Sequence, residues 1–90
     1  MEIIYRMSAG EIEQDMRLVG ETYKLGSGKT NTMRGRRLFD EIVPAKYIER
    51  ARDIVNDCKY VYSHGMRQPR DFTVEDIAVL KYLVEYCMKL

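Results

Sequence analysis

The sequence predicts an all-α domain, a small bundle of three main helices with a short basic helix between the first two. Three long segments carry apolar residues at helical spacing, and glycine or proline marks the breaks between them. The 90 residues, 46% hydrophobic and 32% charged, are typical of one folded domain spanning residues 1–90. Because the core of such a short chain is small, we expect a homo-oligomer rather than a monomer.

The first segment is predicted to form a helix over residues 9–25. Ser8 and Glu11 have the spacing of a capping box, and Gly26 is expected to end the helix in the left-handed conformation. The apolar face would consist of Ile12, Met16, Val19 and Tyr23. Residues 1–7 are either a short strand or an extended arm. A single strand has nothing in this chain to pair with, which favours an arm or pairing across a dimer.

Residues 24–37 form the most distinctive stretch, here named the basic segment. It holds five cations, three glycines and no acid, whereas residues 1–23 hold two cations and five acids, and residues 38–90 hold eight cations and nine acids. Glycines allow backbone amides to converge on a phosphate, and cations around them add charge. The candidate phosphate-binding residues are Lys24, Ser27, Gly28, Lys29, Thr30, Arg34, Arg36 and Arg37. The alternative is a solvated linker.

The run Gly26-Ser27-Gly28-Lys29-Thr30 is similar to the end of a nucleotide-binding P-loop. The P-loop requires a further glycine where this chain has Tyr23, and it follows a strand, whereas a helix is predicted here. We therefore do not expect a P-loop NTPase.

A short helix is predicted from Asn31 or Thr32 through Ile42. Gly35 should weaken it by ~1 kcal/mol relative to alanine. Its buried side would consist of Leu38, Phe39, Ile42 and Val43, with Arg34 and Arg37 turned to solvent.

The next helix is predicted over residues 44–64, with Pro44 in its first turn and Gly65 after its end. Its apolar stripe comprises Tyr47, Ala51, Ile54, Val55, Cys58, Val61 and Tyr62. The last helix begins at the N-cap Thr73, where Phe72 can pack on Ile77, and reaches the C-terminus. Its predicted buried face comprises Ile77, Leu80, Leu83, Val84, Cys87 and Met88.

Arg67 and Arg70 form a second, smaller basic group before the last helix. They either join the basic segment or belong to a solvated turn. A helix-turn-helix DNA reader is disfavoured, because the connection over residues 65–72 is longer than the usual turn of 3–4 residues. The last helix also offers Lys81 and Lys89 but no arginine or asparagine on an outer face.

The sequence gives little support for catalysis or for metal binding. His64 is the only histidine, so one chain cannot assemble a zinc-type ligand set, and no serine has an obvious base. Cys58 and Cys87 each fall in an apolar stripe, which favours free thiols in a reducing cytoplasm over a disulfide. We expect no signal peptide, no membrane span, no cofactor and no enzymatic activity.

These patterns predict a non-enzymatic binding protein. Its basic segment would engage phosphate, in nucleic acid or in a nucleotide that it sequesters. The alternative is a small protein-binding inhibitor or adaptor, of the kind that viruses and mobile elements encode, which docks on an acidic protein surface. Apolar anchors such as Met33, Leu38 or Phe39 would then carry the binding.

Overall fold

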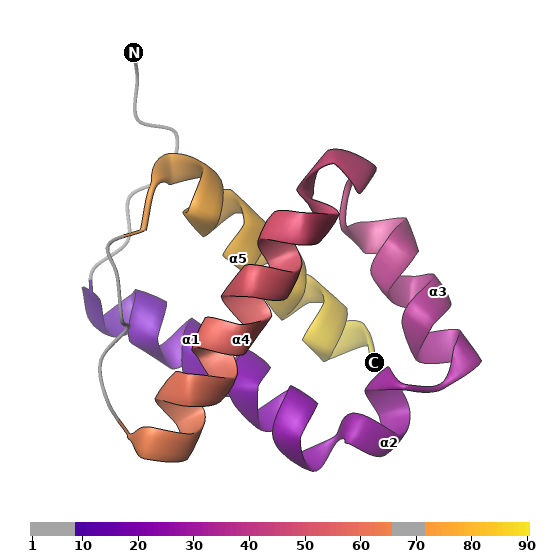
Figure 1. Ribbon diagram of the computed structural model, residues 1–90, viewed down its shortest axis with the longest axis horizontal. Helices are drawn as coiled ribbons and strands as arrows, with labels where there is room; N and C mark the ends of the chain where they lie inside the picture. The colour runs from indigo at the N-terminus through magenta and orange to yellow at the C-terminus, as the bar shows by residue number, and fades with distance from the viewer. Residues whose placement is uncertain (1–8, 66–71) are drawn as a thin grey trace.

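A computed structural model describes residues 9–65 and 72–90, and this part of the chain is a helical bundle without strands (Figure 1). In chain order its elements are α1 (Ala9–Leu25), α2 (Ser27–Thr30), α3 (Met33–Ile42), the 3-10 turn η1 (Ala45–Tyr47), α4 (Ile48–His64) and α5 (Val74–Lys89). The predicted all-α class is therefore confirmed. The arm or strand at residues 1–7, the Ser8 cap, and Arg67 and Arg70 lie outside the described residues.

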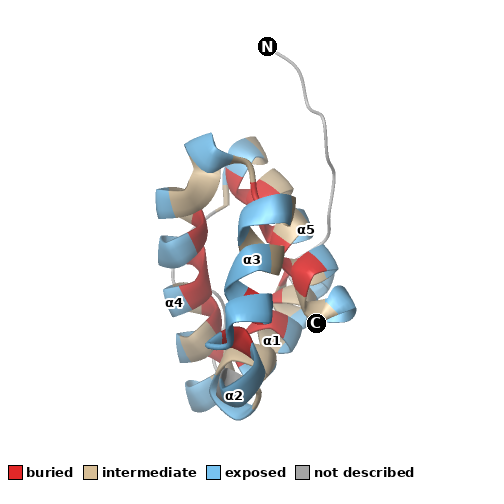
Figure 2. Cartoon of the chain, turned by 90° about the vertical axis from the view of Figure 1, so that its right-hand side faces the viewer, coloured by how far each residue is buried: buried red, intermediate tan, exposed pale blue. Residues whose placement is uncertain are grey.

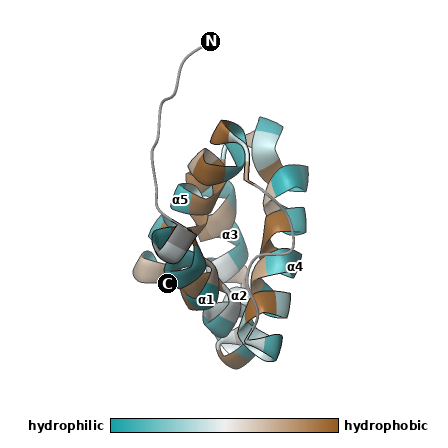
Figure 3. Ribbon diagram, turned by 90° about the vertical axis from the view of Figure 1, so that its left-hand side faces the viewer, coloured by the Kyte–Doolittle hydropathy of each residue, from teal (hydrophilic) through white to brown (hydrophobic). Residues whose placement is uncertain are grey.

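Three helices, α1, α4 and α5, enclose the core. Helix α4 crosses α1, and α5 contacts both of them (Figure 1). The buried residues of α4 lie along one side of the helix, toward the interior (Figure 2), and this side is largely hydrophobic (Figure 3). The core cluster comprises Ile12, Met16, Val19, Val43, Ala51, Ile54, Val55, Cys58, Val61, Ile77, Val79, Leu80 and Leu83.

Helices α1 and α4 approach closely because α1 carries a glycine at their crossing. Gly20 is buried, and a Cβ atom there would overlap the carbonyl oxygen of Cys58 on α4. Glycine is thus required by backbone proximity and not by an unusual backbone conformation.

The start of α5 is fixed by a capping box and an ion pair, which confirms the predicted N-cap. The Thr73 hydroxyl accepts from the Asp76 amide at 3.1 Å, and Asp76 Oδ2 accepts from the Thr73 amide at 3.0 Å. Asp76 is only 1% exposed, and its Oδ1 accepts a 2.8 Å hydrogen bond from Arg50 of α4. Arg50 also bonds Glu75 at 3.1 Å, so the pair joins α4 to α5.

The glycine-rich part of the basic segment is not the loop that was predicted. The Gly26 amide donates to the Thr22 carbonyl at 2.8 Å, which extends the last turn of α1, and the Gly26 carbonyl accepts from Lys29 at 2.8 Å, which starts α2. Helix α1 ends at Leu25, as predicted, but among the described residues the glycine with positive φ is Gly65, so the left-handed conformation predicted for Gly26 is wrong. The chain bends at Gly26 and continues as one short helical turn.

Two further helix boundaries agree with the prediction, and one differs from it. Thr32 caps α3, its hydroxyl accepting from the Gly35 amide at 2.9 Å, and Gly65 ends α4 with φ 64°, both as predicted. Pro44, however, precedes the separate turn η1 instead of lying in the first turn of α4.

Helix α5 is buried over more of its circumference than its periodicity predicted. Val79 and Tyr86 are 0% and 1% exposed although neither was in the predicted stripe, whereas Met88 is 77% exposed although it was. The physical reason is that α5 contacts α3 as well as α1 and α4, so it buries a second face.

Candidate functional site

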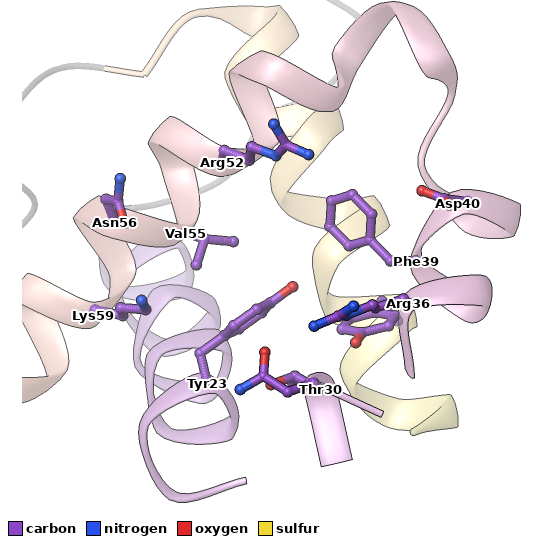
Figure 4. A pocket seen from close by; sticks show the side chains of 11 residues that line it. Tyr23, Thr30, Arg36, Phe39, Asp40, Arg52, Val55, Asn56 and Lys59 are labelled. Atoms are coloured by element: carbon purple, nitrogen blue, oxygen red, sulfur yellow. The ribbon is translucent and has the colours of Figure 1, made fainter. Parts of the chain in front are cut away.

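A half-open cavity of about 680 Å³ lies between α3 and α4 (Figure 4). Helices α1 and α5 contribute the residues at its base, and the turn after α2 closes one end. The cavity is lined by Tyr23, Thr30, Asn31, Arg36, Phe39, Asp40, Arg52, Val55, Asn56, Lys59 and Tyr86.

Three cations line this cavity, here named the cavity cations: Arg36 from α3 and Arg52 and Lys59 from α4. None of their three side chains forms a hydrogen bond or ion pair with another described residue. Asp40 is the one carboxylate in the lining. Like charges gathered beside a cavity repel one another, so an anion bound there would relieve a repulsion as well as form contacts.

The spacing along α4 explains why its cations reach the cavity. Arg52 and Lys59 are seven residues apart, close to two helical turns, and therefore lie on one side of the helix. Val55 and Asn56 fill the turn between them. These residues border the core stripe of α4. Val55 is buried and lines the cavity from the core side, whereas Arg52 and Asn56 are exposed at the cavity.

Helix α3 is held opposite α4 by contacts at both of its ends. Near its start, buried Gly35 lies against the Lys29 and Thr30 carbonyl oxygens, where a Cβ atom would overlap Lys29. Farther along, the Phe39 ring meets the buried Tyr86 ring edge to face, with centroids 5.6 Å apart. These contacts fix the side of α3 that carries Arg36.

Aromatic rings form the floor of the cavity. Besides Phe39, the Tyr86 ring contacts Tyr23, with centroids 6.1 Å apart and the planes inclined by 36°. Burial raises the pKa of Tyr23, with smaller contributions from Tyr86 and the nearby thiols, and burial also raises the pKa of Tyr86. Both phenols therefore stay neutral at physiological pH, so they add no negative charge to the cavity.

Of the predicted phosphate-binding residues, the structure brings Arg36 and Thr30 to the cavity. Lys24, Gly28, Lys29 and Arg37 are exposed outside its lining, and the side chain of Ser27 lies outside the described residues.

Arg34 is exposed, as predicted, but it does not line the cavity, because its side chain is held at the end of α5. Its guanidinium donates to the Leu90 and Lys89 carbonyl oxygens at 3.1 and 3.3 Å, at the end of α5. A cation there is favoured because the last carbonyls of a helix carry partial negative charge. Arg34 thus joins α3 to α5.

Sequence reasoning missed Arg52 and Lys59 as site residues. Their common signal is the seven-residue spacing on one side of a helix, but neither residue was among the predicted site residues. Which side of this helix meets the basic segment depends on how α3 packs.

The two cysteines are free, as predicted, and their thiols are protonated at neutral pH. Cys58 is fully buried and Cys87 is partly buried. Burial is the main cause that raises the pKa of both thiols, so they remain protonated at neutral pH.

Within residues 9–65 and 72–90, no cluster of three or more histidine, cysteine or acidic side chains could hold a metal ion. Over the same ranges, no helix combines the length and apolar character needed to cross a bilayer.

Comparison with known proteins gives no relative for this chain: no protein family matches it, and neither a curated protein nor a solved structure is significantly similar.

Proposed function

We propose that this chain is a non-enzymatic binding protein whose ligand carries phosphate and is held in the cavity between α3 and α4. The single observation that carries the proposal is the convergence of Arg36, Arg52 and Lys59 on one cavity with one carboxylate among its lining residues. Arginine and lysine are the residues that bind phosphate most often, because their donors match its oxygens and their charge opposes it.

The rest of the basic segment contributes a wider positive field. Lys24, Lys29 and Arg37 are exposed near the cavity without lining it, so they attract an anion over a distance instead of holding it. A phosphate group in nucleic acid and one in a free nucleotide meet the same chemistry in this region. The proposal therefore covers both kinds of ligand.

The test compares two double variants that each remove two positive charges. Arg36→Ala/Arg52→Ala removes two cavity cations, and Lys24→Ala/Arg37→Ala removes two exposed cations outside the cavity. Binding of inorganic triphosphate is measured by calorimetry, and binding of a fluorescein-labelled single-stranded DNA by anisotropy, both at several salt concentrations. We expect at least a tenfold loss of affinity in the first variant and less than a threefold loss in the second. Equal losses, or no binding of either probe to the wild-type protein, would refute the proposal.

A second candidate function is the protein-binding inhibitor or adaptor of viral or mobile-element type. It is supported by the exposure of Met33, 78%, and Leu25, 70%, which lie within the basic segment and could anchor an acidic protein surface. In that case Met33→Ala would abolish capture of the partner, whereas Arg36→Ala/Arg52→Ala would leave it intact.

Self-association and cytoplasmic location belong to the same proposal. Leu18, Leu25, Met33 and Met88 are exposed apolar side chains that a homo-oligomer would cover, and light scattering after gel filtration tests this directly. The two free, protonated thiols suit a reducing compartment.

A further inference from the structure

The cavity offers more than positive charge, because its floor is aromatic. Tyr86 is 1% exposed and is covered by Tyr23 and Phe39, both of which are only partly buried and line the cavity. A phosphate ion alone would leave these ring surfaces in contact with water. Flat, uncharged ring surfaces at the base of a cavity are the type of surface on which a nucleobase stacks.

Two carboxamides add hydrogen-bonding groups of the kind that recognise a base. Asn31 and Asn56 are exposed and line the cavity. Each amide presents a donor and an acceptor side by side, the arrangement that pairs with the edge of a base. A phosphate could accept from their N–H groups but would leave both carbonyl acceptors unused.

The three cavity cations do not lie at one point of the cavity. Arg52 and Lys59 are about 10 Å apart along α4, with Val55 and Asn56 between them. In the view of Figure 4, Arg36 and Arg52 lie on the side of the Phe39 ring, whereas Lys59 and Asn56 lie beyond Tyr23. A ligand with an anionic group near Arg36 and Arg52 and a flat polar portion over the rings would match both kinds of lining residue.

We propose that this ligand is a free nucleotide. Its phosphates bind between Arg36 and Arg52, and its base lies on the rings of Tyr23 and Phe39 within reach of Asn56. The volume of about 680 Å³ lies within the range of sites for small molecules, roughly 300 to 1,000 Å³. This inference rests on the proposed function and narrows its ligand from phosphate in general to one nucleotide.

The experiment is calorimetry of the wild-type protein at one fixed salt concentration. The probes are ATP, GTP, CTP, UTP, the four nucleosides, inorganic triphosphate and a ten-nucleotide oligothymidylate. Stacking of a base on an aromatic ring strengthens binding by about 5- to 150-fold. We expect at least one nucleoside triphosphate to bind about tenfold more tightly than inorganic triphosphate. The nucleosides should bind more weakly than their triphosphates.

A variant of the floor provides a second readout. Phe39→Leu keeps an apolar side chain against Tyr86 but removes the ring, so the fold is retained, as circular dichroism will verify. It should weaken the preferred nucleotide at least fivefold and change inorganic triphosphate less than twofold. Equal effects on both probes would contradict base stacking on Phe39.

The outcomes separate this inference from the proposed function. If inorganic triphosphate binds within threefold of every nucleotide, or if only the oligonucleotide binds, the nucleotide inference is wrong while phosphate binding stands. If no probe binds, both are wrong.

Discussion

The substitution Gly35→Ala distinguishes helix propensity from packing, because the two act in opposite directions. Alanine favours a helix over glycine by ~1 kcal/mol, so propensity alone predicts a more stable protein. In the structure the new methyl group would overlap the Lys29 carbonyl oxygen and lie 2.9 Å from that of Thr30. These are backbone atoms of the adjoining turn, so they cannot rotate away as a flexible side chain would.

Overpacking of this kind costs typically about 1 to 3 kcal/mol, which exceeds the gain in propensity. Because the atoms in the way are backbone atoms, we expect a cost in the upper part of this range, about 2 to 3 kcal/mol, which leaves a net loss of about 1 to 2 kcal/mol in the free energy of unfolding after the gain in propensity. For a domain of this size the melting temperature should fall by about 4 to 15 °C. Thermal and urea denaturation followed by circular dichroism measure both quantities.

Gly28→Ala is the matched control, because Gly28 is helical and exposed and a Cβ atom there meets nothing within 4 Å. It should leave stability unchanged or raise it by up to about 1 kcal/mol. A Gly35→Ala protein as stable as the wild type would refute the close packing of α3 on α2, and with it the placement of Arg36.

Three further predictions concern the bundle itself. Arg50→Ala should cost about 1 to 2 kcal/mol in urea denaturation, because it removes a hydrogen-bonded cation from the buried Asp76, although water screens the 38%-exposed Arg50. Lys89→Ala, which breaks an exposed pair, should cost less than about 0.5 kcal/mol, and equal costs would contradict this. Stability should fall as pH rises above the ordinary thiol and phenol pKa values of 9.0 and 10.0, because the unfolded chain releases protons that the folded chain retains. Tyr23→Phe should reduce this alkaline loss of stability, and a stability profile flat to pH 11 would contradict the prediction. At pH 8, Cys58 should react with iodoacetamide only after denaturation, and rapid labelling of the native protein would show that it is not buried.

The main helices were predictable because their signals are local and strong. The stripe of α4, from Ala51 to Val61, repeats at helical spacing, and the Thr73 cap was recognised from its acidic first turn. The turn α2 was not predictable, since four residues that include a glycine have little helical preference of their own. It is held by hydrogen bonds to Gly26 and by the packing of Gly35.

The candidate site was predictable only in part, because it is built from segments distant in the sequence. The excess charge of the basic segment indicated the region and included Arg36. The role of Arg34 depends on a hydrogen bond to Leu90, across 56 positions, and the roles of Arg52 and Lys59 depend on the position of α3 opposite α4. Such contacts follow from tertiary packing, about which the pattern of a single segment carries no information.

The most direct measurement for the central claim is a nuclear magnetic resonance titration of the wild-type protein with inorganic triphosphate. The amide and side-chain signals of Arg36, Arg52 and Lys59 should shift together with one dissociation constant, while those of Lys24 and Arg37 move little. Shifts confined to Lys24 and Arg37, or no saturable shifts at all, would contradict a phosphate site between α3 and α4.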